Sequence, residues 1–387
     1  MTVAPALPRS SRGRRTPIVL LALGGATFAA GLFRAPAAVW PAYLASVFAL
    51  TTVGLGAAVF VALHHVTGAR WGRAVLPVAH AVTTVLPWAG LAHLVLPFGV
   101  ATLHPWADPA AVAADHALSG RAGWMTVPWV IGRTAVAFGA WVLLARVLVA
   151  RSRATTTDSP AGARSAAARA GVRFLLAFAP TFSVYGFDWV LSLERTFAST
   201  MFAVYHFSGL FLGAVALVTI LAIRRRRSGR LAPDPAWSET LHDLGKLVFA
   251  FAFFWGYIWY CQYMLIWYTN LPEETPHYVI RHRGAWEPVA VLNVVLQWLV
   301  PFVILMPRAM KRNETVLLRV CAVVLVGRVA DLALAVLAPV HGAALPGLAW
   351  ELGVSLGGVG AFLVLWRRAT DGSDEPPTTD VVARAQA

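Results

Sequence analysis

The chain has 387 residues, of which 58% are hydrophobic and only 13% are charged, and its formal net charge is +14. A water-soluble protein of this length needs a much more charged surface, so the composition excludes an ordinary soluble fold. The two cysteines, Cys261 and Cys321, lie inside apolar stretches, so we expect no disulfide framework, no haem-attachment motif and no iron–sulfur cysteine cluster.

Apolar stretches of roughly 20 residues recur along the chain, and each is long enough to cross about 30 Å of hydrocarbon. Lipid offers the backbone no hydrogen-bond partner, so each stretch is predicted to be helical. The predicted fold is therefore all-α: a polytopic integral membrane protein with about ten transmembrane helices. The predicted spans are 17–33, 37–63, 74–100, 124–148, 170–191, 200–223, 244–268, 287–307, 314–338 and 346–366. They form one membrane domain (17–368) between a basic N-terminus (1–16) and a flexible tail (369–387).

Basic residues concentrate in alternate loops between these spans. The N-terminus and every second loop carry Arg9, Arg12, Arg14, Arg15, Arg70, Arg73, Arg151, Arg153, Arg164, Arg169, Arg224 to Arg227, Arg230, Arg308, Lys311 and Arg312. The intervening loops carry few. The positive-inside rule then predicts that both termini are cytoplasmic. The same distribution makes the arginine run at 224–227 a topology signal rather than a nucleic-acid surface.

The first span has an alternative interpretation. Its basic start, short apolar core and following small residues also fit a secretory or twin-arginine signal peptide. The alternation of basic loops favours a retained helix. The loop at 151–169 is rich in Ser, Thr, Ala and Arg, and we expect it to be flexible, like the tail after Arg368.

Ionisable residues at membrane depth are costly and are functional candidates by default. Arg328 and Asp331 are three residues apart on one predicted helix and are expected to neutralise each other, as a structural ion pair or as part of a proton path. Other polar residues fall at a similar depth in the predicted outer half, as a shared pocket would require. The candidate catalytic or charge-relaying residues are His93, Arg133, Asp188, Arg328 and Asp331.

A second polar set lies nearer the predicted inner face. His64, His65 and Lys246 are explained by snorkelling at helix ends, whereas His80 is deeper and is a proton-path candidate. Haem ligation by His80 and His93 would need a matching pair on a second helix. His206 stands alone on the sixth span, and thirteen helical steps put the two histidines on different faces unless prolines bend the helix.

The stretch "YIWYCQYMLIWYTNLPEET" at 257–275 carries aromatic residues spaced three, four and three apart. Such a stripe is typical of helix packing or of an interfacial belt, and it also suits a flat wall for a quinone ring. The candidate quinone-binding residues are Tyr257, Tyr260, Gln262, Tyr263, Met264 and Trp267. Asn270 and Pro272 are predicted to end the helix. Glu194, Glu273 and Glu274 are candidates for the proton path or for outer-face partner contacts.

The stretch "HDLGKLVFAFAFFWGYIWYCQYMLIWYTNLPEET" at 242–275 resembles the signature of the ActF-type membrane subunit of alternative complex III, a quinol:cytochrome c oxidoreductase unrelated to cytochrome bc complexes. Further similar stretches follow the same order along the chain: "HHVTGARWGR" at 64–73, "LHPWA" at 103–107, "DWVLSLERTFASTMF" at 188–202 and "GRVADL" at 327–332. The resemblance therefore spans nearly the whole chain.

The resemblance implies an NrfD-like (polysulfide-reductase-type) helix bundle in a bacterial cytoplasmic membrane. It implies a sister NrfD-like subunit, an iron–sulfur subunit and c-type cytochromes as partners, with a non-covalently bound quinone or menaquinone and no haem or iron–sulfur cluster on this chain. In that family the better-supported quinol site belongs to the sister ActC-type subunit, so proton passage or assembly is the other implied role.

The expected function is thus a quinone-interacting pocket or proton path near the outer face of a respiratory quinol oxidoreductase. Two alternatives stay open. A non-catalytic scaffold subunit would share every gross feature. A secondary transporter would also use Pro-broken helices and polar residues near mid-membrane, although no inverted repeat is visible in the sequence.

Overall fold

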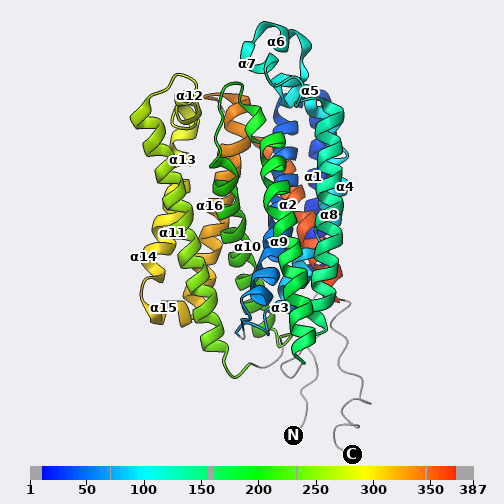
Figure 1. The fold of residues 1–387 in the computed structure, drawn as a ribbon, viewed down its shortest axis with the longest axis vertical. Helices are drawn as coiled ribbons and strands as arrows, with labels where there is room; N and C mark the ends of the chain where they lie inside the picture. Colours follow the sequence, from blue (N-terminus) through cyan, green and yellow to red (C-terminus); the bar gives the residue numbers. More distant parts are fainter. Residues whose placement is uncertain (1–10, 70, 156–159, 232–233, 345–346, 372–387) are drawn as a thin grey trace, which may run out of the picture.

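The computed structural model describes residues 11–69, 71–155, 160–231, 234–344 and 347–371. Within these ranges the chain is helical and contains no strand (Figure 1). Nine helices in the described ranges are long and apolar enough to cross a membrane, and a bent pair brings the total to ten. The prediction of an all-α, multi-pass membrane protein is confirmed. Residues 1–10 and the tail after Asp371 lie outside the described ranges.

Most predicted spans are single continuous helices. They are α1 (Ser11–Arg34), α2 (Pro36–Val66), α8 (Val127–Arg153), α9 (Ala161–Trp189), α10 (Phe202–Arg227), α11 (Trp237–Thr269), α16 (Glu314–His341) and α17 (Leu348–Asp371). Large apolar side chains remain exposed around the bundle, including Phe33, Val136 and Leu176 at 90%, 70% and 71% exposure. Such a surface is stable only where hydrocarbon covers it.

The predicted span at 74–100 is broken by its prolines. It consists of α3 (Leu76–Thr83), α4 (Leu86–His93), η1 (Leu96–Gly99) and α5 (Val100–Leu103), with a 47° bend between the pieces before and after residues 94–95. Pro77, Pro87 and Pro97 each lie in the first turn of a new piece. Proline is tolerated there because its missing N–H would have no partner in any case.

The predicted span at 287–307 contains a π-helical turn. α13 (Glu287–Val294) passes through η5 (Val295–Leu299), which is the π turn, into α14 (Val300–Leu305). Pro301 has no N–H to donate to the carbonyl of Gln297, so the regular α-helical ladder cannot continue through this point. π turns occur frequently at functional sites, and this one lies beside the site described below.

The expectation of a flexible loop over residues 151–169 was wrong for most of its length. Helix α8 continues to Arg153 and α9 begins at Ala161, so both helices extend past the predicted ends. The alanine-rich stretch "AGARSAAARAG" at 161–171 has high helix propensity, which outweighs its lack of hydrophobicity. Residues 156–159 lie outside the described ranges.

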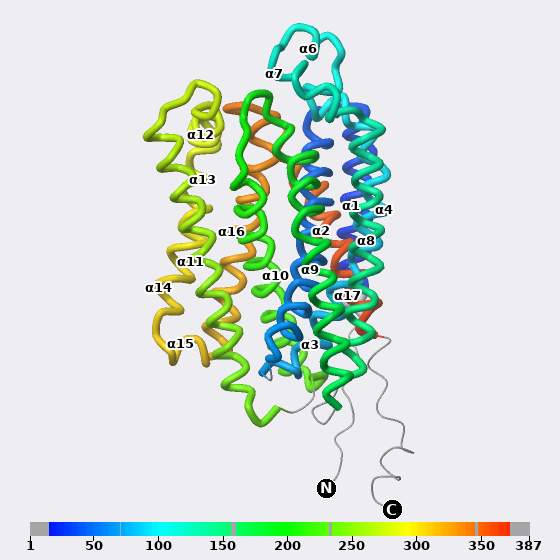
Figure 2. The backbone as a smooth tube through the Cα atoms, in the orientation of Figure 1, coloured from blue at the N-terminus to red at the C-terminus, as the bar shows by residue number. Residues whose placement is uncertain are grey.

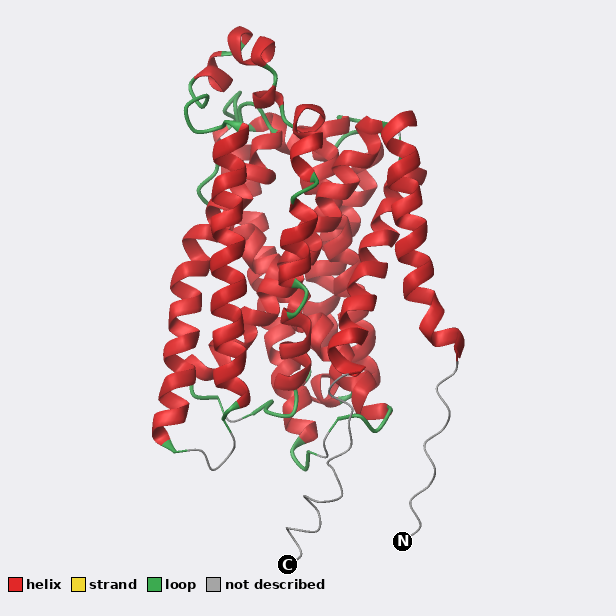
Figure 3. Cartoon of the chain, turned by 90° about the vertical axis from the view of Figure 1, so that its right-hand side faces the viewer, coloured by secondary structure: helices red, strands yellow, loops and turns green. Residues whose placement is uncertain are grey.

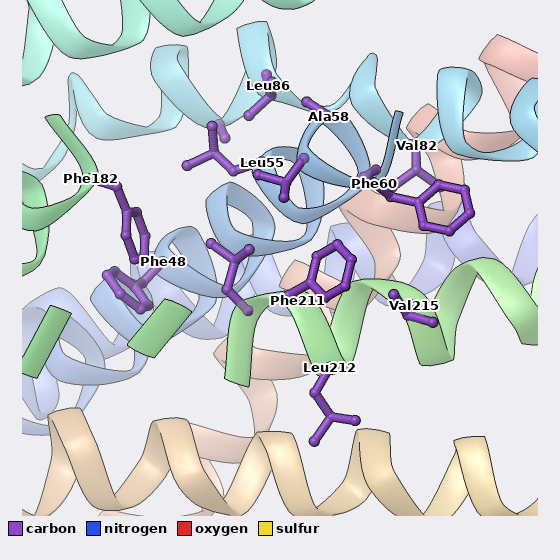
Figure 4. Packing of buried hydrophobic residues seen from close by; sticks show 14 of the residues in the cluster. Phe48, Leu55, Ala58, Phe60, Val82, Leu86, Phe182, Phe211, Leu212 and Val215 are labelled. Carbon is purple, nitrogen blue, oxygen red and sulfur yellow. The ribbon is translucent and has the colours of Figure 1, made fainter. Parts of the chain in front are cut away.

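Helices α2 and α10 form the centre of the bundle (Figure 4). Phe48, Leu55 and Phe60 of α2 are buried against neighbours that include Phe211 and Val215 of α10. α2 also packs against α9 and α17. The backbone trace in Figure 2 shows α11 and α14 on one side of this centre, with α1, α4 and α8 on the other.

Helices α1 and α17 pack closely and run antiparallel. A Cβ added at Gly24 would lie 2.2 Å from Gly357 Cα, while Gly353 faces Thr27 and Gly360 faces Leu21. Small residues let two backbones approach this closely in a membrane. The start of α1 and the end of α17 therefore lie at the same end of the bundle, called the lower end here. The helix α12 (Thr275–Arg281) lies at the opposite, upper end (Figure 1 and, turned by 90°, Figure 3).

Candidate functional site

The centre of the candidate site is the carboxylate of Asp331 on α16. Asp331 and Arg328 are 2% and 6% exposed and form an ion pair one helical turn apart. The predicted neutralisation of these two charges is confirmed. A buried pair of this kind is held in place only if hydrogen bonds satisfy its remaining polar atoms.

Neighbouring helices supply such bonds to the Asp331 carboxylate, whereas Arg328 Nη2 is buried and has no hydrogen-bond partner among the described residues. The Tyr205 hydroxyl of α10 donates to Asp331 Oδ1, and Asn293 Nδ2 of α13 donates to the same atom at 3.2 Å. Gln297 Nε2, in the π turn, donates to Asn293 Oδ1 at 2.9 Å. The carboxylate is therefore surrounded by donors from α10, α13 and its own helix.

A small cavity of about 40 Å³ lies beside this carboxylate. Tyr205, His206, Gln262 and Asn293 line it together with Asp331. The volume suits a few water molecules, since one water needs roughly 10–15 Å³. His206 is 1% exposed, and neither of its ring nitrogens has a partner in the described part of the chain. Water in the cavity would satisfy it, because buried polar atoms in native proteins are almost always hydrogen-bonded.

The upper side of the same cavity is formed by two ionisable residues of α12, His277 and Arg281. His277 Nδ1 lies 2.9 Å from Glu194 Oε1, and Arg281 Nη2 donates to that oxygen at 2.8 Å. Phe197 stacks on the His277 ring with centroids 3.8 Å apart. His277 and Arg281 both line the cavity, so a chain of polar groups runs from Asp331 to the upper end of the bundle.

These upper groups lie outside the membrane-spanning segments and have shifted pKa values. Burial raises the pKa of Glu194, but the charges of Arg281 and His277 outweigh burial and lower the pKa to about 2. Burial, followed by the Arg281 charge, lowers the pKa of His277 to about 4. The direction of these shifts favours a charged Glu194 and a neutral His277 at neutral pH.

The other predicted catalytic residues form a second cluster, between α4, α8 and α9. Arg133 makes a bidentate ion pair with Asp188, with two nitrogen–oxygen distances of 2.9 Å, and its guanidinium also lies over the Trp124 ring. His93 Nε2 lies 2.8 Å from the Tyr185 hydroxyl, and His93 Nδ1 lies 2.8 Å from the Ala89 carbonyl. Every polar group of this second cluster named here has a partner.

The two clusters are separated by an aromatic ring. Phe48 stacks on Tyr185 at 5.5 Å between centroids and contacts His206 edge-on at 5.6 Å. A phenyl ring offers no hydrogen bond, so no direct hydrogen-bonded route joins the clusters through this contact. The shared depth predicted from the sequence therefore does not place His93, Arg133 and Asp188 in the pocket that contains Asp331.

The aromatic stripe of α11 faces outward. Tyr257, Tyr260, Met264 and Trp267 are between 45% and 68% exposed, and the Tyr260 hydroxyl lies 3.3 Å from Met264 Sδ. Helix α11 ends at Thr269, as predicted, and Asn270 takes a left-handed conformation with φ of 49°. The stripe thus contributes to the lipid- or partner-facing surface and not to the interior.

Gln262 and Tyr263 of the predicted quinone set turn toward the site, and Trp267 at the end of the stripe lies beside Tyr263. Gln262 lines the cavity and donates to Ser199 Oγ at 3.1 Å. Tyr263 and Trp267 line an open groove of about 260 Å³ between α11 and α12, together with Tyr278 and His282. Tyr278 and His282 also line the cavity, so the groove and the cavity share a wall.

The remaining candidates lie elsewhere. Glu273 is exposed, and its backbone carbonyl accepts a bond from Thr196; Glu274 is half-buried. His80 lies toward the lower end and bonds to Ser152. Neither glutamate at 273 or 274 has an ion-pair partner in the part of the chain that the structure describes.

Sequence reasoning missed several residues of the site. Tyr205, His277, Asn293 and Gln297 carried no prediction, and His206 was considered only as an unmatched haem ligand. Asn293 and Gln297 are amides four residues apart inside an apolar run, and His277 and Arg281 have the same spacing. Polar residues four apart share a helix face, so this spacing could have identified these residues from the sequence.

Comparison with known proteins does not identify a family for this chain. No family model matches this chain, and no curated protein is significantly similar to it.

Proposed function

We propose that this chain is a membrane subunit of a respiratory quinol:cytochrome c, or other acceptor, oxidoreductase in a bacterial cytoplasmic membrane, and that the polar chain from Asp331 to Glu194 conducts protons toward the outer face. The observation that carries the proposal is the buried Asp331 carboxylate beside a water-sized cavity, with His206, His277 and Arg281 leading from it to one end of the bundle. Intramembrane carboxylates and histidines arranged in series are typical of proton relays.

The direction of this path follows from charge. The basic helix α15 (Arg308–Arg312) lies at the lower end in Figure 1, as do the arginine-rich ends of α8 and α10. The positive-inside rule then favours a cytoplasmic lower end and an outer upper end. Protons released at Glu194 would leave on the side where the partners implied by the resemblance to ActF-type subunits, including c-type cytochromes, accept electrons.

The quinone contact belongs, in this proposal, to the groove between α11 and α12. Its aromatic walls, Tyr263, Trp267 and Tyr278, suit a flat ring. His282 lines both groove and cavity and lies where a proton leaving a quinol would enter the relay. The exposed stripe of Tyr257, Tyr260 and Met264 would then face the lipid or the sister subunit.

The scaffold alternative is favoured by one observation, the closed second cluster. Arg133 and Asp188 satisfy each other and the Trp124 carbonyl, as expected for a pair that only fixes helix positions. In a purely structural subunit, both clusters would only fix the positions of the helices.

The first experiment is to tag the chain in its native host, extract it in mild detergent, and record what co-purifies together with a haem spectrum. Recovery of c-type haem, an iron–sulfur protein and a second membrane subunit supports the oxidoreductase. A colourless, solitary chain from intact membranes contradicts it and directs attention to transport assays.

The second experiment measures quinol oxidation and proton release per assembled complex for Asp331→Asn, with Asp188→Asn as the matched control. Loss of turnover in Asp331→Asn alone supports the relay. Equal turnover per assembled complex in both variants supports the scaffold. If Asp331→Asn does not assemble, Tyr205→Phe replaces it in the comparison with Asp188→Asn, because Tyr205→Phe removes only one hydrogen-bond donor to Asp331.

A further inference from the structure

The lower end of the bundle contains a basic recess that the proposed redox role does not use. It has a volume of about 740 Å³ and lies where α2 ends, α3 begins and α8 ends. Its polar lining includes Arg73, Arg153, His64, His65, His80 and Ser152, and none of its described lining residues is acidic. A recess with this charge favours an anion.

The deep wall of the recess is a built polar site rather than a loose surface. Ser152 and His80 are 3% and 4% exposed, and the Ser152 hydroxyl lies 2.7 Å from His65 Nε2 and 2.8 Å from His80 Nε2. His64 is 5% exposed, and its buried Nδ1 has no hydrogen-bond partner among the described residues. Buried polar atoms are nearly always hydrogen-bonded, so a ligand or a water molecule is expected to bind this nitrogen.

The arginines at the mouth of the recess are available to a ligand. Neither Arg73 nor Arg153 forms an ion pair with an acidic residue of the described chain. Guanidinium groups bind phosphate oxygens in a forked, two-bond geometry, which makes arginine well suited to this ligand.

An apolar groove continues from the recess along the membrane depth. It has a volume of about 480 Å³ and lies between α3–α4 and α8, with walls that include Trp88, Leu91, Val142 and Val149. His80 and Arg153 line both spaces, so the two are continuous. A basic head site joined to an apolar channel matches an amphiphile with an anionic head.

We infer that this recess and groove bind an anionic phospholipid, with its phosphate between Arg73, Arg153 and the histidines and an acyl chain between α4 and α8. Basic pockets between transmembrane helices on the cytoplasmic side bind anionic lipid head groups. Lipid binding of this kind depends on the charge and shape of the recess and is independent of whether the chain belongs to an oxidoreductase.

The test is native mass spectrometry of the full chain, with any co-purified partners, titrated with phosphatidylglycerol or phosphatidylcholine. We expect phosphatidylglycerol to bind more tightly, and Arg73→Gln/Arg153→Gln to weaken its binding about 30-fold, because each basic residue near a membrane surface contributes about 1 kcal/mol. The matched control is Arg151→Gln, an exposed residue of the same helix α8 that does not line the recess, and it should bind like the wild type.

A second pair of variants tests the acyl-chain groove. Val149→Trp should fill the groove and weaken lipid binding, whereas Val147→Trp, on the exposed side of α8, should not. Equal binding of the two lipids, or no effect of the arginine substitutions, overturns the inference. Displacement of the lipid by inorganic phosphate at a comparable concentration, with Val149→Trp harmless, also overturns it by identifying a free anion as the ligand.

Discussion

Gly209 of α10 faces the guanidinium of Arg328 on α16, and a Cβ added at position 209 would lie 2.4 Å from Arg328 Nη1. The missing side chain is what allows the charged group to lie between these two helices beside Asp331. One turn further along α10, a Cβ at Gly213 would meet Arg328 Cγ at 3.4 Å, an ordinary contact.

Gly209→Ala is therefore expected to destabilise the protein by about 1–3 kcal/mol through overpacking. Gly213→Ala is the control: its added Cβ makes only an ordinary contact and gains helix propensity, so stability should be unchanged or rise by up to about 1 kcal/mol. Thermal unfolding of both variants in the same detergent measures the difference. Equal shifts would show that the Arg328 guanidinium does not lie next to Gly209.

Asp331→Asn should destabilise the chain by about 3–5 kcal/mol, because it leaves the buried Arg328 charge without its partner. The double variant Arg328→Met/Asp331→Leu removes both charges and should be closer to the wild type. The single variants Arg328→Met and Asp331→Leu complete a double-mutant cycle, which gives the coupling energy in detergent. If the single and double variants were equally unstable, the loss would come from packing rather than from the unpaired charge.

Acidification should open the upper end of the bundle in two stages. The pKa of His277 is lowered from 6.5 to about 4, so the folded state resists protonation and loses stability as the pH falls from 6.5 toward 4. The pKa of Glu194 is lowered from 4.5 to about 2, so its stabilising contribution is present above pH 4.5 and is lost as the pH falls toward 2.

Hydrogen exchange of the α12 backbone at several pH values checks this expectation. The lowered pKa of Glu194 corresponds to about 3 kcal/mol of stability. Glu194→Gln should therefore speed exchange at neutral pH, and it should no longer show the loss of stability between pH 4.5 and 2. Glu273→Gln, an exposed residue near the same helix, should exchange like the wild type. Identical pH profiles for Glu194→Gln and the wild type would contradict the assignment.

If quinol binds in the groove between α11 and α12, Tyr263→Leu should raise the KM for quinol about 2- to 10-fold, since one aromatic contact contributes about 0.5–1.5 kcal/mol. Tyr257→Leu is the matched control, because Tyr257 is 54% exposed and does not line the groove. Steady-state kinetics of the assembled complex give both values. A larger effect at Tyr257 would move the contact to the outward stripe.

Properties that depend on one helix at a time could be predicted from the order of the residues. Hydropathy located the spans because each must be apolar over the thickness of the bilayer. Spacing identified the Arg328–Asp331 pair because residues three apart share a helix face. Asn270 and Pro272 marked the end of α11, and the prolines of the third span indicated that this span could bend, because their effect on the backbone is local.

Which helix faces meet became known only from the packing of the whole bundle. The sequence gives the depth of a residue along its helix but not which neighbouring helix its side chain faces. Depth alone therefore could not separate His93, Arg133 and Asp188 from the pocket of Asp331. For the same reason the aromatic stripe of α11 was predicted to be a wall of a quinone site. Aromatic residues that face lipid and those that face a pocket have the same spacing. Tyr205, Asn293 and Gln297 join the site because α10, α13 and the π turn pack against α16. Spacing within one segment does not encode this relation between distant segments.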